Sequence, residues 1–445
     1  CIPKPCTTRQ AINSLLFNVS DVGFEYFNDH CRLPDDKPRV AADYVLIVLG
    51  KSFSVYTNGR RLMTFNSGSG SIGCLDGIRT FAMAWVVLGH TFSSEVPQTN
   101  PIDYITQWNA VWILAGHYTV DTFFFLSGFL VIYTTVGKHF IPETLLKNLH
   151  LFYLNRLLRM FPLLAGAVLI EASLLNRMGD GPYWNTAALL VNSCRTNWWS
   201  TLLHIQNYVN PAQTCMGHSW YLAVDVQLHI LSPIVLVWVL YGKKKIAWTA
   251  LGVKPRQCIK ICNLFFFSYE EMYDYLINYY VNTLTRAGPF FVGMIFGYAV
   301  KVTKIKLRGV TYIFYKKALI YFVLLRIFIV IYWAAFFALM TYLMYHNYPI
   351  NSQPDRDKPF MDGFYNSFYR SFWAFGIGCI VYACVNGFGG PINWFLSLQV
   401  WKIHARLSYA IYLYHQMLMV AVNYSAIGPV YFDVGLFVST SITYQ

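Results

Sequence analysis

The sequence predicts an all-α protein, a polytopic bundle of helices embedded in a membrane. Hydrophobic residues make up 56% of its 445 residues and charged residues 12%, whereas soluble domains average roughly 45–50% and about 25%. Apolar segments of about 20 residues, the length that a helix needs to cross a bilayer, recur along the chain. Together these observations exclude a soluble globular protein.

The chain is basic, with a formal net charge of +13. Its Lys and Arg residues stand beside the apolar segments and do not form one solvated stripe, so nucleic-acid binding is a poor explanation. Cytosolic loops of membrane proteins carry such an excess of basic residues. We therefore expect membrane lipids, and no nucleic acid, among the partners.

Residues 1–40 are polar and differ from the rest of the chain. They contain cysteines and one glycosylation sequon, at Cys1, Cys6, Cys31 and Asn18. Such a segment is typical of the end of a disulfide-rich extracellular or lumenal domain; free thiols in an unstructured tail are the alternative. Residues 41–71 are a short apolar segment with a linker, and 72–445 form the membrane domain. Because the chain starts without Met and stops within an apolar stretch, we expect both ends to be cut.

Eight segments are long and apolar enough to be candidate membrane helices. They are 72–93, 117–136, 160–175, 218–241, 284–300, 316–345, 364–386 and 400–424. A ninth, 430–445, is apolar but truncated, and Pro162 predicts a break near the start of the third. Clusters of Lys and Arg mark the cytosolic loops. The protein is then multi-pass in the plasma membrane or endoplasmic reticulum, with its N-terminal segment extracellular or lumenal.

Alternation of sides requires two more crossings, for which the sequence offers only short apolar segments. One is 40–49, and the other, 246–270, is interrupted by charges. Ten helical residues rise about 15 Å, half of a hydrocarbon core of about 30 Å. Either this sequence lacks pieces of two helices, or both segments lie in the interface. The loop 176–217 falls outside, where Cys194 and Cys215 can form a disulfide.

Ionisable residues inside membrane spans are costly and usually face a cavity, so they are candidate site residues. Arg79 and His90 lie eleven positions apart in the first span. Eleven residues turn a helix by about three full turns and rise about 16 Å, so both side chains share one face. That face holds a cation near the cytosol and an imidazole near the outer side.

A second basic pair, Arg156 and Arg159, is spaced i,i+3 where a helix enters the membrane from the cytosol. Two guanidinium groups on one face suit a pyrophosphate or an anionic lipid head group. Simple anchoring of the helix on the cytosolic side is the alternative.

His218 and Asp225 lie seven positions apart, on one face of the fourth span. A carboxylate near an imidazole would hold its tautomer and raise its basicity, as a general base requires. A satisfied structural pair is the alternative. No zinc-ligand spacing, phosphate-binding loop or nucleophile elbow occurs in a suitable context, so we expect no metal.

Five ordered sequence blocks resemble the membrane acyltransferase-3 family, and specifically its animal, nose-resistant-to-fluoxetine branch. The blocks are Gly77-Ile78-Arg79 with His90; Val120-Asp121-Thr122-Phe123-Phe124-Phe125-Leu126-Ser127-Gly128; Arg156-x-x-Arg159; Gly217-His218-Ser219-Trp220-Tyr221-Leu222-Ala223-Val224-Asp225; and Leu407-Ser408-Tyr409-x3-Leu413-x-His415. The resemblance covers most of the chain.

This resemblance implies a core of about ten helices that moves an acyl group from a cytosolic donor such as acyl-CoA to an acceptor hydroxyl or amine. Arg79, Arg156 and Arg159 would bind the donor, and His90 would act as the base or relay the acyl group. The remaining site residues come from the same blocks: His218 and Asp225 as catalytic residues, and Asp121, Ser127 and His415 as substrate contacts.

Transport is the second function that this resemblance suggests, because the animal branch is associated with uptake of lipids and xenobiotics. The same intramembrane charges would then line a translocation path. The sequence has no visible inverted repeat, which disfavours a conventional secondary transporter. The extracellular domain is mostly absent and two helices are short, so this particular chain could also be inactive.

Overall fold

A computed structural model describes residues 54–65, 70–92, 107–135, 142–240, 276–310, 318–346 and 359–428, and every regular element in these ranges is helical. The chain divides into two units, Cys1–Asn66 and Ser67–Gln445. The described part of the first unit is helix α3 (Val55–Leu62), which Ser54 caps by accepting a hydrogen bond from the Thr57 amide. Cys1, Cys6, Cys31 and Asn18 lie outside the described residues.

The second unit contains long helices joined by short ones. Their bounds are α4 (Cys74–Phe92), α6 (Val111–Leu114), α7 (Tyr118–Thr135), α8 (Pro142–Lys147), α9 (Leu149–Ser173), α10 (Trp184–Leu202), α11 (Gln206–Val209), α12 (Trp220–Leu240), α15 (Thr283–Val310), α16 (Ala318–Tyr345), α18 (Pro359–Val385), α19 (Gly390–Leu396) and α20 (Trp401–Asn423). Tight helical turns cover Trp108–Ala110, Ala115–His117, Leu175–Arg177, Gly217–Ser219 and Leu276–Tyr280.

Each of the eight segments expected to cross the membrane coincides with a long helix. Among the described residues, five stretches are long and apolar enough to span a bilayer: Trp108–Thr135, Leu149–Ser173, Gly217–Leu240, Arg326–Tyr345 and Ser367–Val385. The chain is therefore a helical membrane protein. The count of about ten core helices stays a prediction, because 40–49, 246–270 and 430–445 fall outside the described residues.

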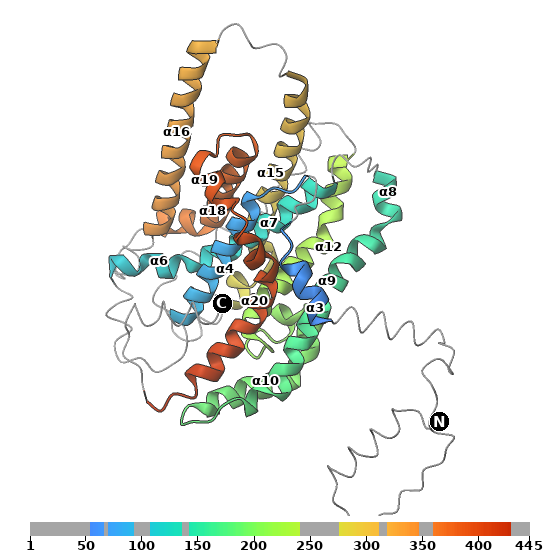
Figure 1. Cartoon of the computed structure of the whole chain (residues 1–445). Helices are drawn as coiled ribbons and strands as arrows, with labels where there is room; N and C mark the ends of the chain where they lie inside the picture. Colours follow the sequence, from blue (N-terminus) through green and yellow to red (C-terminus); the bar gives the residue numbers. More distant parts are fainter. Residues whose placement is uncertain are drawn as a thin grey trace, which may run out of the picture. The chain divides into compact units, whose positions relative to one another are not determined.

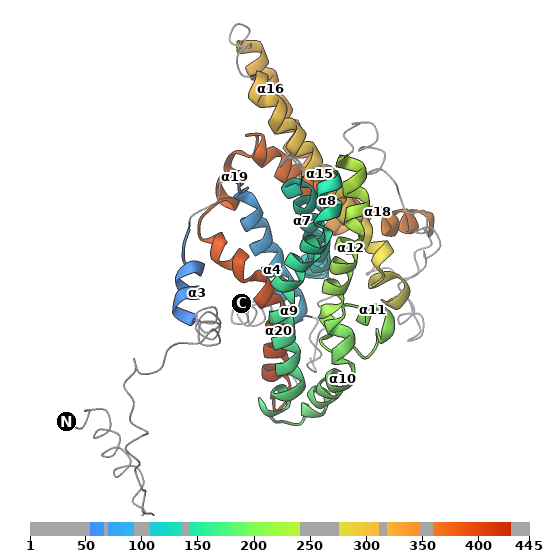
Figure 2. The same cartoon turned by 90° about the vertical axis from the view of Figure 1, so that its right-hand side faces the viewer.

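Helix α7 lies at the centre of the second unit, among α4, α12, α15 and α18 (Figures 1 and 2). Glycines allow α7 and α15 to touch backbone to backbone: a Cβ added at Gly128 would overlap the Phe290 carbonyl, and one added at Gly293 would overlap the Phe125 carbonyl. Small residues drive such close packing in membranes, where apolar burial gives little preference for protein over lipid.

Three groups of buried apolar side chains surround this centre. One joins α4, α9, α10 and α20, a second joins α4, α7 and α18, and a third joins α7, α12 and α15. Helix α4 contributes side chains to the first two groups, and helix α7 contributes to the last two. The side chains of Phe123 and Tyr221 pack against more than one group.

One expectation about local structure was wrong. Helix α9 runs without interruption through Pro162, although a proline removes the hydrogen bond to the carbonyl four residues before it. Membrane helices tolerate this because neighbouring groups compensate the lost bond. The segment 176–217, expected to connect two spans, contains α10 and α11 and is largely helical.

Candidate active site

Three histidines from distant parts of the sequence converge beside α4. His90 lies in the last turn of α4, His218 in the turn Gly217–Ser219 that precedes α12, and His415 in the second half of α20. The ring centroid of His415 lies 5.1 Å from that of His90 and 5.2 Å from that of His218. The centroids of His90 and His218 are 6.5 Å apart. We call these three residues the histidine cluster.

The closest contact within the histidine cluster joins His90 and His415. The Nδ1 atom of His90 lies 2.8 Å from the Nε2 atom of His415. The Nδ1 atom of His415 lies 3.0 Å from the Ile411 carbonyl oxygen, one turn earlier in α20. Both ring nitrogens of His415 are therefore engaged in hydrogen bonds.

The turn that carries His218 is held in place from three sides. A disulfide joins Cys194 of α10 to Cys215, just before the turn. Met216 adopts a left-handed backbone conformation, with φ of 59°, and its amide donates to the Glu171 carboxylate across 3.2 Å. The Tyr412 hydroxyl donates to the His218 carbonyl. These contacts fix the position of an imidazole that lies outside regular helix.

A charged network lies deeper along α12, and its centre is Arg156. This guanidinium forms an ion pair with Asp225 and donates to the Ser127 hydroxyl across 3.1 Å. It also approaches the His229 ring nitrogen at 3.4 Å. Arg156 therefore connects α9 to α7 and α12, and Ser127 is one of its hydrogen-bond acceptors.

Asp225 does not contact His218, contrary to the pairing that their spacing suggested. Seven residues rise about 10 Å along a helix, so a shared face leaves two turns between the side chains. The cationic Arg156 reaches Asp225 from α9, and a charged guanidinium is a stronger partner for a carboxylate than a neutral ring. The ring nitrogens of His218 have no hydrogen-bond partner among the described residues.

The other two predicted donor-binding arginines, Arg79 and Arg159, lie on α4 and α9. Arg159 is exposed on α9, one turn after Arg156. Arg79 is partly buried on α4 and interacts electrostatically with Asp76, Arg159 and the Tyr221 hydroxyl. Arg79 and Arg159 thus interact electrostatically, although they come from different blocks of the sequence.

Tyr221 lies between the arginines and the histidine cluster. Its ring centroid is 4.7 Å from Phe124 and 5.6 Å from Tyr412, and Tyr412 contacts His218. Its hydroxyl interacts electrostatically with Asp225 and Arg156 as well as with Arg79. Tyr221 is therefore connected to the histidine cluster through Tyr412 and to the arginines by electrostatic interactions.

A second buried ion pair joins Asp121 of α7 to Arg286 of α15. Their closest atoms are 3.1 Å apart, and neither side chain is exposed. The Arg286 guanidinium lies over the Trp220 and Tyr280 rings, at 4.9 and 4.4 Å from their centroids. The resemblance implies that Asp121 contacts substrate; in the structure its carboxylate pairs with this buried cation, and the substrate role stays a prediction.

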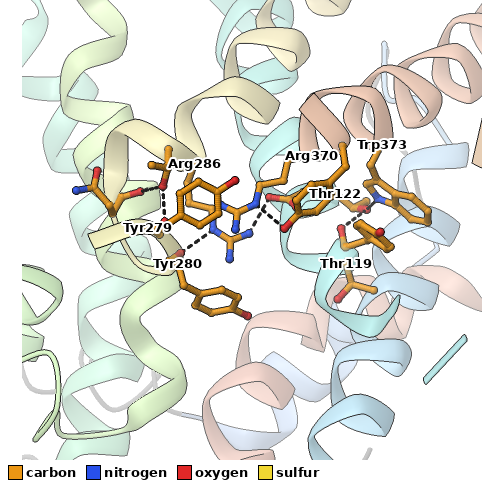
Figure 3. Close-up of polar contacts among 12 residues, drawn as sticks. Thr119, Thr122, Tyr279, Tyr280, Arg286, Arg370 and Trp373 are labelled. Carbon is orange, nitrogen blue, oxygen red and sulfur yellow. Dashed lines mark hydrogen bonds and ion pairs between the residues drawn. The ribbon is translucent and has the colours of Figure 1, made fainter. Parts of the chain in front are cut away.

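Arg370 of α18 also lies near Tyr280, the aromatic residue that it shares with Arg286 (Figure 3). Its guanidinium lies 4.6 Å from the Tyr279 centroid and 5.9 Å from the Tyr280 centroid. Nearby, the Trp373 indole donates to the Thr122 hydroxyl across 2.9 Å. Sequence reasoning missed Arg286 and Arg370, although both are ionisable residues inside expected spans, which is the signal that selected the other candidates.

One group of described residues has the side-chain types and spacing of a metal site. It consists of Glu171, Cys194 and Cys215, whose ligand atoms lie within 4.8 Å of one another. The two sulfur atoms are joined in the disulfide, so they offer no thiolate to a metal ion. Only the carboxylate remains as a ligand.

A family model for an acyltransferase domain matches residues 72–443, which include the histidine cluster and all three arginines. The chain belongs to the acyltransferase-3 family. The expected family is thereby confirmed, and the match begins at the boundary assigned to the membrane domain.

The curated relatives of this acyltransferase-3 chain include animal and bacterial proteins. It is 26% identical to the nose resistant to fluoxetine protein 6 of Caenorhabditis elegans, over 89% of this chain and 51% of that protein. It is 27% identical to regulator of hypoxia-inducible factor 1 of the same organism, over 52% of the chain and 51% of the relative.

The bacterial match is to the O-acetyltransferase OatA of Staphylococcus aureus, with 25% identity over 38% of this chain and 25% of that protein. This acyltransferase-3 chain spans about half the length of the two nematode relatives. No solved structure matches it significantly.

Proposed function

We propose that this chain is a membrane-bound acyltransferase that moves an acyl group from a cytosolic acyl-CoA-type donor to an acceptor hydroxyl or amine. The observation that carries the proposal is the histidine cluster, in which His90 shares α4 with Arg79. Imidazoles are the commonest general bases, and ionisable side chains inside a membrane are costly and mark functional sites. Family membership and the bacterial O-acetyltransferase relative support the same class of reaction.

His90 acts as the base in this proposal. Its imidazole takes the proton of the acceptor hydroxyl while that oxygen forms a bond to the acyl carbonyl carbon. The carbon–sulfur bond of the donor then breaks, and the imidazolium returns the proton to the leaving thiolate. His218, which faces both other rings of the histidine cluster, is the second imidazole near the reacting atoms.

Arg79 and Arg159 bind the phosphates of the donor, since the two cations interact electrostatically and Arg159 is exposed. Arg156 contributes a third guanidinium whose orientation is set by Asp225 and Ser127. Planar guanidinium groups suit phosphate oxygens, which they can bind with two parallel hydrogen bonds. An acyl chain attached to this donor would pass Tyr221 on its way to the histidine cluster.

The test is turnover of labelled acetyl-CoA and of longer acyl-CoA donors by the purified chain in liposomes. We expect His90→Gln to lower donor turnover by about 100-fold or more, the usual contribution of a general base. His404→Gln is the matched control, because His404 is exposed and far along α20 from His415. Turnover unchanged by His90→Gln would exclude the assigned base.

Donor binding has a separate test in Arg159→Ala. We expect the KM for the donor to rise about tenfold, in line with the loss of one charge-assisted contact of about 1.4 kcal/mol, while kcat changes little. Absence of both donor binding and turnover in the folded wild-type protein would favour the alternative function, uptake of lipids or xenobiotics through the same scaffold.

A further inference from the structure

The two hydrogen bonds of His415 determine where its proton lies. A backbone carbonyl oxygen can only accept, so the contact of 3.0 Å with Ile411 requires a proton on the Nδ1 atom of His415. A neutral imidazole carries one ring proton, which leaves the Nε2 atom of His415 as an acceptor. The position of the proton on His415 thus follows from the accepting carbonyl oxygen of Ile411 and not from an observed hydrogen.

The same reasoning applies to the ring protons of His90. Its Nδ1 atom lies 2.8 Å from the accepting Nε2 atom of His415, so Nδ1 of His90 must donate. The lone pair of His90 is then on Nε2. In this arrangement one backbone carbonyl of α20 sets the protonation pattern of two imidazoles in sequence.

We propose that His415 is a positioning residue that holds His90 in the tautomer protonated on Nδ1, so that Nε2 is the atom that takes the acceptor proton. This inference rests on the proposed function and changes the expected role of His415, which the sequence suggested to be a substrate contact. His415 acts through His90 and not on the substrate.

A neutral partner suits this location. Catalytic histidines in water-filled clefts commonly use a carboxylate for this task, but an isolated carboxylate inside a membrane carries a large desolvation cost. A second imidazole accepts the same hydrogen bond without a permanent charge. The bond strengthens when His90 becomes cationic, because hydrogen bonds from charged donors are roughly twice as strong. The stabilisation therefore grows toward the transition state.

Two further described groups lie near His90. His218, in the turn before α12, has its ring centroid 6.5 Å away. Tyr412 of α20 contacts His218 and lies 6.1 Å from His415 between ring centroids. The partners of His415 in its two hydrogen bonds are a ring nitrogen and a backbone carbonyl oxygen.

The first experiment reads the tautomer directly and needs no activity. Solid-state NMR of the full chain in liposomes, with ¹⁵N-labelled histidine, distinguishes a protonated Nδ1 from a protonated Nε2. The chain has 11 histidines, so the signal of His90 is assigned by its loss in His90→Gln. We expect His90 protonated on Nδ1 in the wild type, and loss of that preference in His415→Leu. A wild-type His90 protonated on Nε2 would overturn the inference.

The second experiment compares His415→Leu with His415→Gln in donor turnover. Leu removes the acceptor, and we expect kcat to fall about 100-fold with the donor KM unchanged, as for loss of a group that acts on the base. Gln retains an accepting oxygen, so the kcat of His415→Gln should be at least tenfold higher than that of His415→Leu. Met419→Leu, a buried conservative change on the same helix, controls for packing. Equal activity of the Leu and Gln variants would contradict the positioning role.

These outcomes separate the inference from the proposed function. A wild type with His90 protonated on Nδ1 and no turnover of any donor would reject the enzyme while supporting the relationship between the two rings. A change of both histidine signals on treatment with EDTA would instead reveal a metal ion between the rings and overturn the hydrogen bond.

Discussion

Arg156 and Asp225 form an ion pair whose carboxylate is only 6% exposed and whose guanidinium is 23% exposed. The pair joins α9 to α12 at a position seven residues after His218 of the histidine cluster. Removal of one partner would leave the other charge buried without compensation, whereas replacement of both by apolar groups avoids that cost.

This arrangement predicts a non-additive double-mutant cycle. We expect Asp225→Leu and Arg156→Met each to destabilise the protein by about 3 kcal/mol. The double variant Arg156→Met/Asp225→Leu should be more stable than either single variant, yet inactive in donor turnover. Thermal unfolding in a mild detergent measures the stabilities. Strictly additive losses would mean that the ion pair contributes no coupling.

The contact between α7 and α15 predicts a sharp sensitivity to one added methyl group. Gly293→Ala places a Cβ against the Phe125 carbonyl, and because backbone cannot move aside as a side chain can, we expect a loss of about 2 kcal/mol or more. Gly166→Ala is the control, since its nearest neighbour is the Tyr414 hydroxyl at 3.5 Å. Equal melting temperatures for the two variants would refute this account of the interface.

The disulfide between Cys194 and Cys215 predicts a dependence on reducing agents. It closes a loop with a sequence separation of 21, which corresponds to about 3 kcal/mol in the chain-entropy model. We expect dithiothreitol to lower both the melting temperature and donor turnover, because Cys215 precedes His218 by three residues. Cys194→Ala should abolish the effect of dithiothreitol, while Cys379→Ser should leave it intact.

His204, between α10 and α11, predicts a loss of stability in acid. Burial lowers the pKa of His204 to about 4 from its ordinary value of 6.5, and the nearby Asp225 opposes part of this shift. The unfolded chain therefore binds a proton that the folded protein excludes between these values. Stability is greatest above pH 6.5 and should fall by about 3 kcal/mol as the pH approaches 4.

The measurement is the melting temperature across pH 4 to 7 for the wild type and two variants. His204→Gln should flatten the profile, because it removes the titrating ring. His404→Gln changes an exposed histidine and should leave the slope as in the wild type. A wild-type slope that persists in His204→Gln would assign the effect to another group.

Hydropathy predicted where the long helices lie, because each apolar segment is a local property of the sequence. Periodicity also placed Arg79 and His90 on one helix correctly. It could not identify the partner of Asp225, since a shared helix face does not specify which neighbouring helix supplies a charge. Arg156 and His415 reach their partners across 69 and 325 positions of the chain, and such pairs depend on tertiary packing.

Pro162 shows a different kind of error. The expectation of a break applied a rule from soluble helices, in which proline removes one hydrogen bond and its ring clashes with the preceding turn. In a membrane helix, neighbouring groups satisfy the freed carbonyl, and the helix continues. Arg286 and Arg370 were missed because the sequence around them contains no motif. Tyr279 and Tyr280, which lie against their guanidinium groups, belong to the helical turn Leu276–Tyr280, and this contact exists only in the folded chain.

Helix α16 turns most of its described apolar side chains outward, and among these Phe328, Val330, Ile331 and Phe337 are exposed. Side-chain hydrogen bonds join it to the rest of the unit: Tyr332 and Trp333 donate to the Cys379 and Phe388 carbonyls, and Tyr118 and Tyr365 donate to the Leu343 carbonyl. The exposed face of α16 contacts lipid, so a change in bilayer thickness or tension acts on this helix directly. Tyr332 of α16 is bonded to Cys379 of α18, and α18 also carries Arg370 and Trp373. A displacement of α16 would therefore be transmitted through α18 to the buried charges around Arg286.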